Sequence, residues 1–406
     1  MIRIVTLFLL LILYCSLAHT QEKPVTGEQS LLSGLMSATS TTIGGYGNSY
    51  YQHDGNSGSA HVNMERFVLF IGHRFNAGVS LFSEIEVEDA KVAGGEEGGE
   101  IALEQAYLKF DLSRNTHLVA GLFLPRLGIL NESHLPPSFN GNERTTVETL
   151  VIPATWRELG LGLYGKLEAL PLSYSFALVN GLTAAGFEHG TGIRGGRFEG
   201  RNATASNLAI NGSLQYNVDP FIFQVSGYYG GTLGVASTLT DSLHLSSGPF
   251  GTPVAIGEAD VQYSSHGFQF KILGTFISIP DAGAINRAFA NNTPERAYGA
   301  YVEAGFDLLS AFRETSNQQL VAFARYEKLD LNSALPSNGI HDGALQQGHI
   351  VAGLSYLPDP GIVVKADVHF VHTGGQAQGL IVNSDPAGLP SEQNNTLINV
   401  GIGFAF

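Results

Sequence analysis

The residue types that could perform chemistry are concentrated in one irregular stretch, residues 128–157. This stretch contains Glu132, His134, Glu143, Arg144 and Glu148. A histidine beside carboxylates is a common composition of a general acid–base site. However, the chain has no HExxH helix, no GxSxG turn and no nucleophile placed beside a base. The sequence therefore predicts no catalytic residues and no enzyme.

A second group of carboxylates consists of Glu84, Glu86 and Glu88. Alternate residues of a strand lie about 6 to 7 Å apart on one face, because a strand rises about 3.3 Å per residue. Three carboxylates at that spacing could bind Ca²⁺ or a cationic solute. We prefer the simpler interpretation of a strand face in contact with water, and the sequence predicts no metal and no cofactor.

Residues 160–165 match the GxGxxG pattern of dinucleotide-binding loops. That motif binds a pyrophosphate only when it follows a strand and opens a helix. Here the glycines lie within an alternating segment, where they allow close packing inside a sheet. We therefore expect no dinucleotide site.

The composition excludes several classes of protein. Of the residues, 10% are aromatic and only 14% are charged, with a net charge of −15. A disordered chain or a basic nucleic-acid-binding protein would not have this balance. The single cysteine, Cys15, lies in the N-terminal apolar run, so disulfide and thiol chemistry are not expected in the mature chain.

The first twenty residues predict a signal peptide. Arg3 precedes an apolar run from residue 4 to 14, and small or polar residues follow, with cleavage expected after Ala18 or Thr20. The run is too short for a retained membrane helix. No linker or change of composition divides the rest, so residues 21–406 are expected to form one domain.

Beyond residue 21, apolar and polar residues alternate with the period of two that is typical of strands. Ile85 and Val87, for example, alternate with the carboxylates of Glu84 and Glu86. Segments of about ten to thirteen residues are long enough for a tilted strand to cross a bilayer. We expect about sixteen strands, near 33–46, 62–75, 78–89, 101–111, 116–127, 158–168, 171–181, 206–217, 221–235, 254–264, 267–279, 297–309, 318–330, 347–357, 361–373 and 396–406.

The connections alternate between short turns and long polar loops. An even number of strands with this alternation is typical of an all-β transmembrane antiparallel β-barrel, with short periplasmic turns and long extracellular loops. Phe406 is the last residue of the last alternating segment, as expected of a chain that the barrel-assembly machinery recognises and inserts. The long connections are expected near 47–61, 90–100, 128–157, 182–205, 236–253, 280–296, 331–346 and 374–395.

The first half of the chain resembles a known family. The motifs are IGGYG, RFVLFIGHRFN and SEIEVEDA within residues 43–89, LEQAYLKFDL at 103–112, and LGILNESHLPPSFNGNERTTVETLVIPATWRELGLGLYG. They are similar to porins of the phosphate-selective (porin O and P type) superfamily, most of all to its Bacteroidetes-like branch. The resemblance implies a sixteen-stranded barrel whose third extracellular loop, here 128–157, folds inward and narrows the pore.

The charges differ from those of phosphate-selective members, which resemble one another in lining the pore with arginines and lysines. Here the polar strand faces carry mostly carboxylates, and the opposing cations are Lys166, Lys271, Arg325 and Lys365. An acidic lumen concentrates cations. The acids on these faces are Glu84, Glu86, Glu88, Glu158, Glu168, Glu258, Asp260, Glu303, Asp307, Glu327 and Asp367.

The sequence thus predicts an outer-membrane porin for passive diffusion of small hydrophilic solutes or ions, with a mild preference for cations. Two alternatives stay open: an anion- or phosphate-selective porin, and a plugged barrel that acts as a structural or binding protein. An outer-membrane enzyme is a third alternative that the sequence favours less. The pore and constriction candidates are Glu132, His134, Glu143, Arg144, Glu148, Glu84, Glu86, Glu88, Glu158 and Arg325.

The expected location is the bacterial outer membrane, with its lipids as partners and a homotrimer as an open alternative. We expect Trp156 to anchor the chain near the membrane interface.

Overall fold

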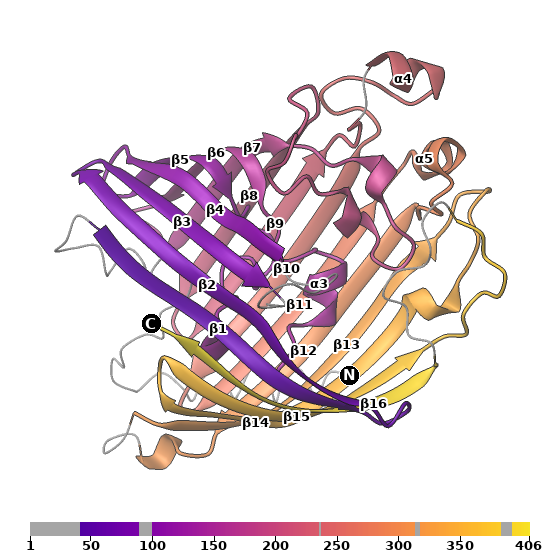
Figure 1. Cartoon of the computed structure of the whole chain (residues 1–406). Helices are drawn as coiled ribbons and strands as arrows, with labels where there is room; N and C mark the ends of the chain where they lie inside the picture. Colours follow the sequence, from indigo (N-terminus) through magenta and orange to yellow (C-terminus); the bar gives the residue numbers. More distant parts are fainter. Residues whose placement is uncertain (1–40, 89–99, 235–236, 313–316, 383–391) are drawn as a thin grey trace, which may run out of the picture.

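Sixteen antiparallel strands close into a barrel (Figure 1). The computed structural model describes residues 41–88, 100–234, 237–312, 317–382 and 392–406. Every strand pairs with its sequence neighbours, and β1 pairs with β16 to close the ring. At the seam, Phe406 N donates to Gly45 O at 2.9 Å and Gly45 N donates to Phe406 O at 3.0 Å. The predicted fold class and strand number are confirmed.

The strands have the following bounds: β1 (Thr41–Asp54), β2 (Ala60–Asn76), β3 (Val79–Glu88), β4 (Glu100–Asp111), β5 (Thr116–Phe123), β6 (Glu158–Lys166), β7 (Leu172–Asn180), β8 (Leu208–Val218), β9 (Phe221–Gly230), β10 (Val254–Ser265), β11 (Phe268–Ser278), β12 (Arg296–Asp307), β13 (Gln319–Ala334), β14 (Gln346–Asp359), β15 (Ile362–Thr373) and β16 (Asn394–Ala405).

The alternation of side chains decides which face of each strand points outward. In β12 the burial pattern is strictly alternating, as expected when one face meets the inside of a barrel and the other its surroundings. The residues with the GxGxxG pattern lie within β6, as predicted. Large apolar side chains exposed on the outer wall include Ile85, Leu161, Phe176, Leu214, Val225, Phe276, Tyr326, Ile350, Phe370 and Val400.

The first strand and first long loop were placed wrongly from the sequence. The strand expected at 33–46 runs instead from Thr41 to Asp54, and the connection to β2 comprises residues 55–59 rather than 47–61. Residues 48–53 continue the ladder because they pair with both β2 and β16. The predicted signal peptide and most of the predicted 90–100 loop lie outside the described residues.

Two of the three register shifts within β1 to β4 leave a glutamate as an extra residue, and neither could be predicted from the sequence pattern. The β1–β2 register shifts between Asn48 and Ser49 and leaves Glu65 as an extra residue on β2. The β3–β4 register shifts between Glu84 and Ile85 and leaves Glu104 as an extra residue on β4. Such β-bulges re-aim side chains. Glu104 and its neighbour Gln105 are consequently both buried, which simple alternation does not allow.

Short helices occupy several connections. They are η1 (Pro136–Ser138), α3 (Thr146–Leu150), η2 (Ala184–Gly186), η3 (Ile193–Gly196), α4 (Ser237–Ser242), α5 (Ala282–Phe289), η4 (Ser310–Phe312) and η5 (Gly343–Leu345). None of the helices in the described part of the chain has the length and apolar character of a membrane span. Helix α3 lies inside the ring of strands, whereas α4 and α5 lie at the end that carries the long connections (Figure 1).

Candidate functional site: an inward-folded loop

The connection between β5 and β6, residues 124–157, enters the barrel and binds its inner wall. We call it the inner loop. Glu148 on α3 organises its first turn. The Glu148 carboxylate accepts hydrogen bonds from Ile129 N at 2.6 Å and Leu130 N at 2.7 Å, and from the Tyr301 hydroxyl of β12 at 2.9 Å. Burial raises the pKa of Glu148, and these hydrogen bonds oppose the rise.

Gly128 allows this turn to form. Its φ is +72°, and a Cβ there would lie 2.7 Å from Glu148 Oε1 and 2.8 Å from Ile152 Cδ1. Both the backbone conformation and the close approach favour glycine. Glu148, one of the pore candidates, is thus fully buried at the base of the inner loop.

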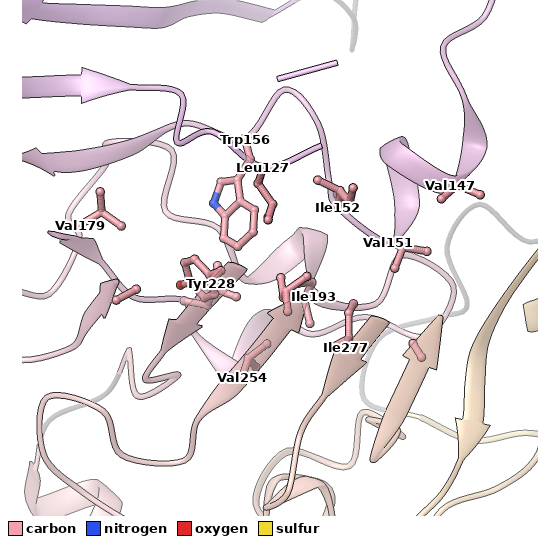
Figure 2. Packing of buried hydrophobic residues seen from close by; sticks show 14 of the residues in the cluster. Leu127, Val147, Val151, Ile152, Trp156, Val179, Ile193, Tyr228, Val254 and Ile277 are labelled. Atoms are coloured by element: carbon pink, nitrogen blue, oxygen red, sulfur yellow. The ribbon is translucent and has the colours of Figure 1, made fainter. Parts of the chain in front are cut away.

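One side of the inner loop is apolar and packs on the wall of β7 to β12. Leu127, Val147, Ile152 and Trp156 of the loop lie against inward side chains such as Tyr228 (Figure 2). The centroids of the Trp156 and Tyr228 rings are 4.6 Å apart. The cluster also includes the wall residues Val179, Val254 and Ile277, and Ile193 of η3. We call this contact the apolar seam.

The expected role of Trp156 as an interface anchor is wrong. The side chain is only 1% exposed and lies within the barrel. Trp156 Nε1 donates to Glu158 Oε1 at 2.6 Å, and Asn180 donates to the other oxygen of the same carboxylate. Glu158, another pore candidate, is therefore buried at the foot of the apolar seam.

The other side of the inner loop binds the wall through polar groups. Asn142 donates from its backbone N at 2.8 Å and its Nδ2 at 2.6 Å to Asp367 on β15. Asn140 Nδ2 donates to Glu303 on β12 at 3.1 Å. Carboxylates of the wall accept these hydrogen bonds, so much of the acidic face predicted from sequence serves to hold the loop. We call this contact the polar seam.

Arg325 on β13 lies at the centre of the polar seam. Its guanidinium group pairs with Glu327 at 2.8 Å and with Glu303 at 3.2 Å. It also donates to the backbone carbonyls of Asn140 at 3.2 Å and Glu143 at 3.5 Å. One buried cation therefore binds two wall acids and the tip of the inner loop.

Glu143 lies where the polar seam still meets water. Its side chain is 38% exposed and lies 3.0 Å from His369 Nδ1, and it accepts from Gln52 at 3.3 Å. His369 in turn contacts His349 at 2.9 Å. Burial raises the pKa of the Glu143 carboxyl, but the hydrogen bond and charge of His369 outweigh that effect and lower it.

His134 contacts the wall of β1 to β4. It is fully buried, with Nε2 3.0 Å from the Tyr46 hydroxyl and 3.6 Å from Glu104 Oε1. Burial lowers the pKa of His134 to about 4, although Glu104 opposes this effect. Glu132, the acid that the sequence places beside it, pairs instead with Arg126 at 2.7 Å. Glu132 and His134 therefore have different partners.

The carboxylates on β3 differ from the expected strand face in water. Glu84 and Glu86 are only 1% and 3% exposed, and Glu88 is half-buried. Arg66 of β2 pairs with Glu86 at 3.4 Å and with Glu88 at 3.6 Å. The expectation of three solvated carboxylates was wrong for the first two, because the inner loop and its neighbours cover them.

Arg144 lies next to Arg66 on this side of the lumen. Burial lowers the pKa of Arg144, as does the neighbouring Arg66, whereas Tyr46, Glu104 and Glu65 oppose the change. Arg144 therefore lies beside the wall acids Glu104 and Glu65.

Two arginines of the connection between β7 and β8 bind the returning end of the inner loop. Arg194 donates to Thr149 O and Ala154 O, both at 3.1 Å. Arg197 donates to Pro153 O at 2.9 Å. Sequence reasoning missed both arginines, because nothing in their own segment indicates that residues 149–155 lie beside them.

Comparisons with known proteins agree with this barrel. In fold the chain is similar to OmpF of Salmonella typhi in a complex with daunomycin, with 13% identity, a TM-score of 0.56 and coverage of 90% of this chain and 97% of the other. It is also similar to an anion-selective porin of Comamonas acidovorans, with 12% identity, a TM-score of 0.54 and coverage of 90% and 99%. At these identities the likeness establishes the fold, that of an outer-membrane barrel.

The family is established by sequence. The chain is 30% identical over 338 residues to a protein of Aquifex aeolicus (strain VF5) described as an uncharacterized protein, covering 80% of this chain and 74% of that one. The chain belongs to the same family as this Aquifex protein. No family model matches the chain, so the predicted membership in the phosphate-selective superfamily stays a prediction.

Proposed function

We propose that the protein is an outer-membrane porin that permits passive diffusion of small hydrophilic solutes and ions. The observation that carries the proposal is the inner loop. It enters the barrel from the long-loop side and binds β12, β13 and β15 across the lumen. A loop held in this way reduces the cross-section by steric means and leaves charged groups at the narrowed passage.

We further propose a mild preference for cations. Among the residues that the structure describes, six of the charged side chains that pair around the inner loop keep a fifth or more of their area exposed. Five of these six are acids, so the charge that meets water is mainly negative. They are Glu65, Glu88, Glu132, Glu143, Glu199 and Lys271.

A planar bilayer under a salt gradient tests both parts of this proposal. The purified protein should conduct, and its reversal potential should have the sign of cation selectivity. A reversal potential of the opposite sign would reject the cation preference in favour of an anion-selective or phosphate-selective porin. The absence of any current from folded protein would reject the channel.

The second candidate function is a plugged barrel that serves as a structural or binding protein. The burial of Glu84, Glu86, Glu158 and Glu327 favours it, since these lumen acids are 3% exposed or less. Deletion of residues 133–149 separates the two functions. A constriction predicts a larger conductance in the deletion variant, whereas a plug that binds a partner predicts loss of binding with little gain in current.

An outer-membrane porin also requires export, insertion into the membrane and an outer wall that suits lipid. A signal peptide of residues 1–20 would direct export, and the domain from residue 21 onward would be inserted by the barrel-assembly machinery through Phe406. The apolar outer wall would contact outer-membrane lipids or, in a homotrimer, a second copy. The protein would perform no catalysis and would bind no nucleic acid.

A further inference from the structure

Three possible metal ligands converge where the inner loop contacts β3 and β4. Glu84, Glu104 and His134 each offer one ligand atom, and the three atoms lie within 4.8 Å of one another. All three residues are buried. They come from separate segments: β3, the bulge of β4, and the inner loop.

The Glu104 carboxylate is directed into this cluster. Its Oε2 accepts from the Tyr46 hydroxyl at 2.8 Å. Its Oε1 is buried and accepts no hydrogen bond within the described residues, and it lies 3.6 Å from His134 Nε2, too far for one. A buried carboxylate oxygen without a donor is costly in a folded protein. A cation beside Oε1 would remove that cost.

The neighbouring polar groups are arranged as the outer ligands of a metal commonly are. Gln105 Nε2 donates to Glu84 Oε2 at 3.0 Å, and Tyr46 donates to Glu104 and contacts His134. Hydrogen bonds of this kind orient metal ligands and tune their basicity.

Carboxylates outnumber guanidinium groups around the cluster, which favours a bound cation. Five carboxylates on β2, β3 and β4 stand near three guanidinium groups, and one of these, that of Arg157, is shared with Glu199. Arg66 is engaged by Glu65, Glu86 and Glu88. The carboxylates are Glu65, Glu84, Glu86, Glu88 and Glu104, and the guanidinium groups belong to Arg66, Arg144 and Arg157.

We propose that Glu84, Glu104 and His134 bind one divalent transition-metal ion, of which Zn²⁺ is the representative, and that this ion ties the inner loop to β3 and β4. Carboxylate oxygens and imidazole nitrogens are both ligands that such ions take, and a water would fill the remaining position. Zn²⁺ bonds of about 2.0–2.2 Å require the three side chains to move slightly closer together. The ion would hold the His134 segment of the inner loop against β3 and β4.

The binding test uses the full-length mature protein, folded in detergent and purified without a polyhistidine tag. After removal of metals with EDTA, Co²⁺ is added and its visible absorption is followed, and Zn²⁺ is then used to displace it. Wild-type protein is expected to bind one equivalent. Glu104→Gln and His134→Ala should bind at least tenfold more weakly, and Tyr46→Phe about 10-fold to 100-fold more weakly.

The matched control is Glu258→Gln, because Glu258 is an equally buried wall acid on β10, outside the cluster. It should retain wild-type affinity. Folding of each variant is checked by the heat-dependent mobility of the barrel on gels. A wild-type protein that shows no Co²⁺ absorption overturns the proposal even if no variant folds. Equal affinity in wild type, Glu104→Gln and Glu258→Gln also overturns it.

This inference and the porin function fail separately. Metal binding is measured in detergent, where no current is needed, and conductance is measured in bilayers with and without Zn²⁺. When both hold, EDTA should increase the current noise of the wild type and leave that of His134→Ala unchanged. A metal-binding barrel that passes no current would support the site and reject the porin.

Discussion

The two seams of the inner loop use opposite physical means to hold one segment. The apolar seam buries Trp156, Val147 and Ile152 against β7 to β12. The polar seam pairs loop amides and carbonyls with Asp367, Glu303 and Arg325. Burial of large apolar side chains contributes about 1.5–3 kcal/mol each, whereas a hydrogen bond contributes about 1 kcal/mol net. The apolar seam therefore contributes most of the free energy that holds the inner loop on the barrel wall.

The polar seam instead fixes where the loop tip lies and makes its binding sensitive to pH and ions. Hydrogen bonds fix the loop tip relative to particular wall residues, and buried polar networks are costly when half satisfied. Charged groups also respond to pH and to ions, which apolar contacts do not. Substitutions in the apolar seam should therefore release the inner loop. Substitutions in the polar seam should change the ion selectivity of the passage.

Trp156→Ala should have the largest effect. Removing a buried tryptophan costs about 4 kcal/mol, within the usual range for large-to-small core changes, and it also leaves Glu158 Oε1 without its donor. Unfolding in urea, followed by the heat-dependent gel shift, should show this loss, and the current should become noisy. Trp156→Phe keeps the ring packing and should cost clearly less. Equal losses in both variants would contradict the proposed weight of the apolar seam.

Arg325→Met should be the next most disruptive change. It leaves Glu303 and Glu327 buried without their cation and removes the donors to two loop carbonyls. Breaking a buried ion pair costs about 3 kcal/mol. Urea unfolding measures this cost, and the reversal potential should move further toward cations. Lys166→Met, at an exposed site, is the control, and an equally small effect of both would show that the polar seam adds no stability.

The sequence predicted the barrel well because its evidence is periodic. Alternation in strands such as β3 and β6 assigns Glu84, Glu86 and Glu158 to the inner face, and the structure places them there. The alternating lengths of the connections identified residues 128–157 as a long connection. Both signals are local, so they can be read without knowing which strands meet.

The contacts of the inner loop could not be predicted because they join residues far apart in the chain. Nothing near Asn142 indicates that it binds Asp367, and nothing near His134 indicates Glu104. The two β-bulges add a second obstacle, since an extra residue reverses the alternation on which face assignment depends. The face of Glu104, at the second bulge, could therefore not be predicted from alternation.

Gly128→Ala tests the turn from which both seams start. Alanine is strained at a φ of +72°, and its Cβ would contact the Glu148 carboxylate. We expect a loss of about 2 kcal/mol, with both the apolar and the polar contacts weakened. Thermal unfolding measures it. Gly274→Ala is the matched control, because a Cβ there meets nothing within 4 Å, and comparable losses in the two variants would refute the special role of this turn.

In the metal-free protein, acidification should weaken two polar contacts of the inner loop in separate pH windows, that of His134 with β1 to β4 and that of Glu143 in the polar seam. The docked His134 has a pKa near 4, below the ordinary value of about 6.5, so it stays neutral while a released loop takes up a proton. Docking should weaken as the pH falls from about 6.5 to 4. The Glu143 carboxyl has a lowered pKa, so its contribution is complete above the ordinary value of about 4.3 and is lost below it.

Glu143→Gln separates these windows and should have the smallest effect. Glu143 is more than a third exposed, so solvent screens its interaction with His369 and little stability should be lost. Single-channel noise is the suitable measurement, since it reports loop movement directly. The wild type should become noisier in two steps, one above and one below pH 4. The variant should keep the first step, which comes from His134, and lose the second. A variant that retains the step below pH 4 would mean that another carboxylate, such as Asp367 beneath Asn142, controls the acid response of the polar seam.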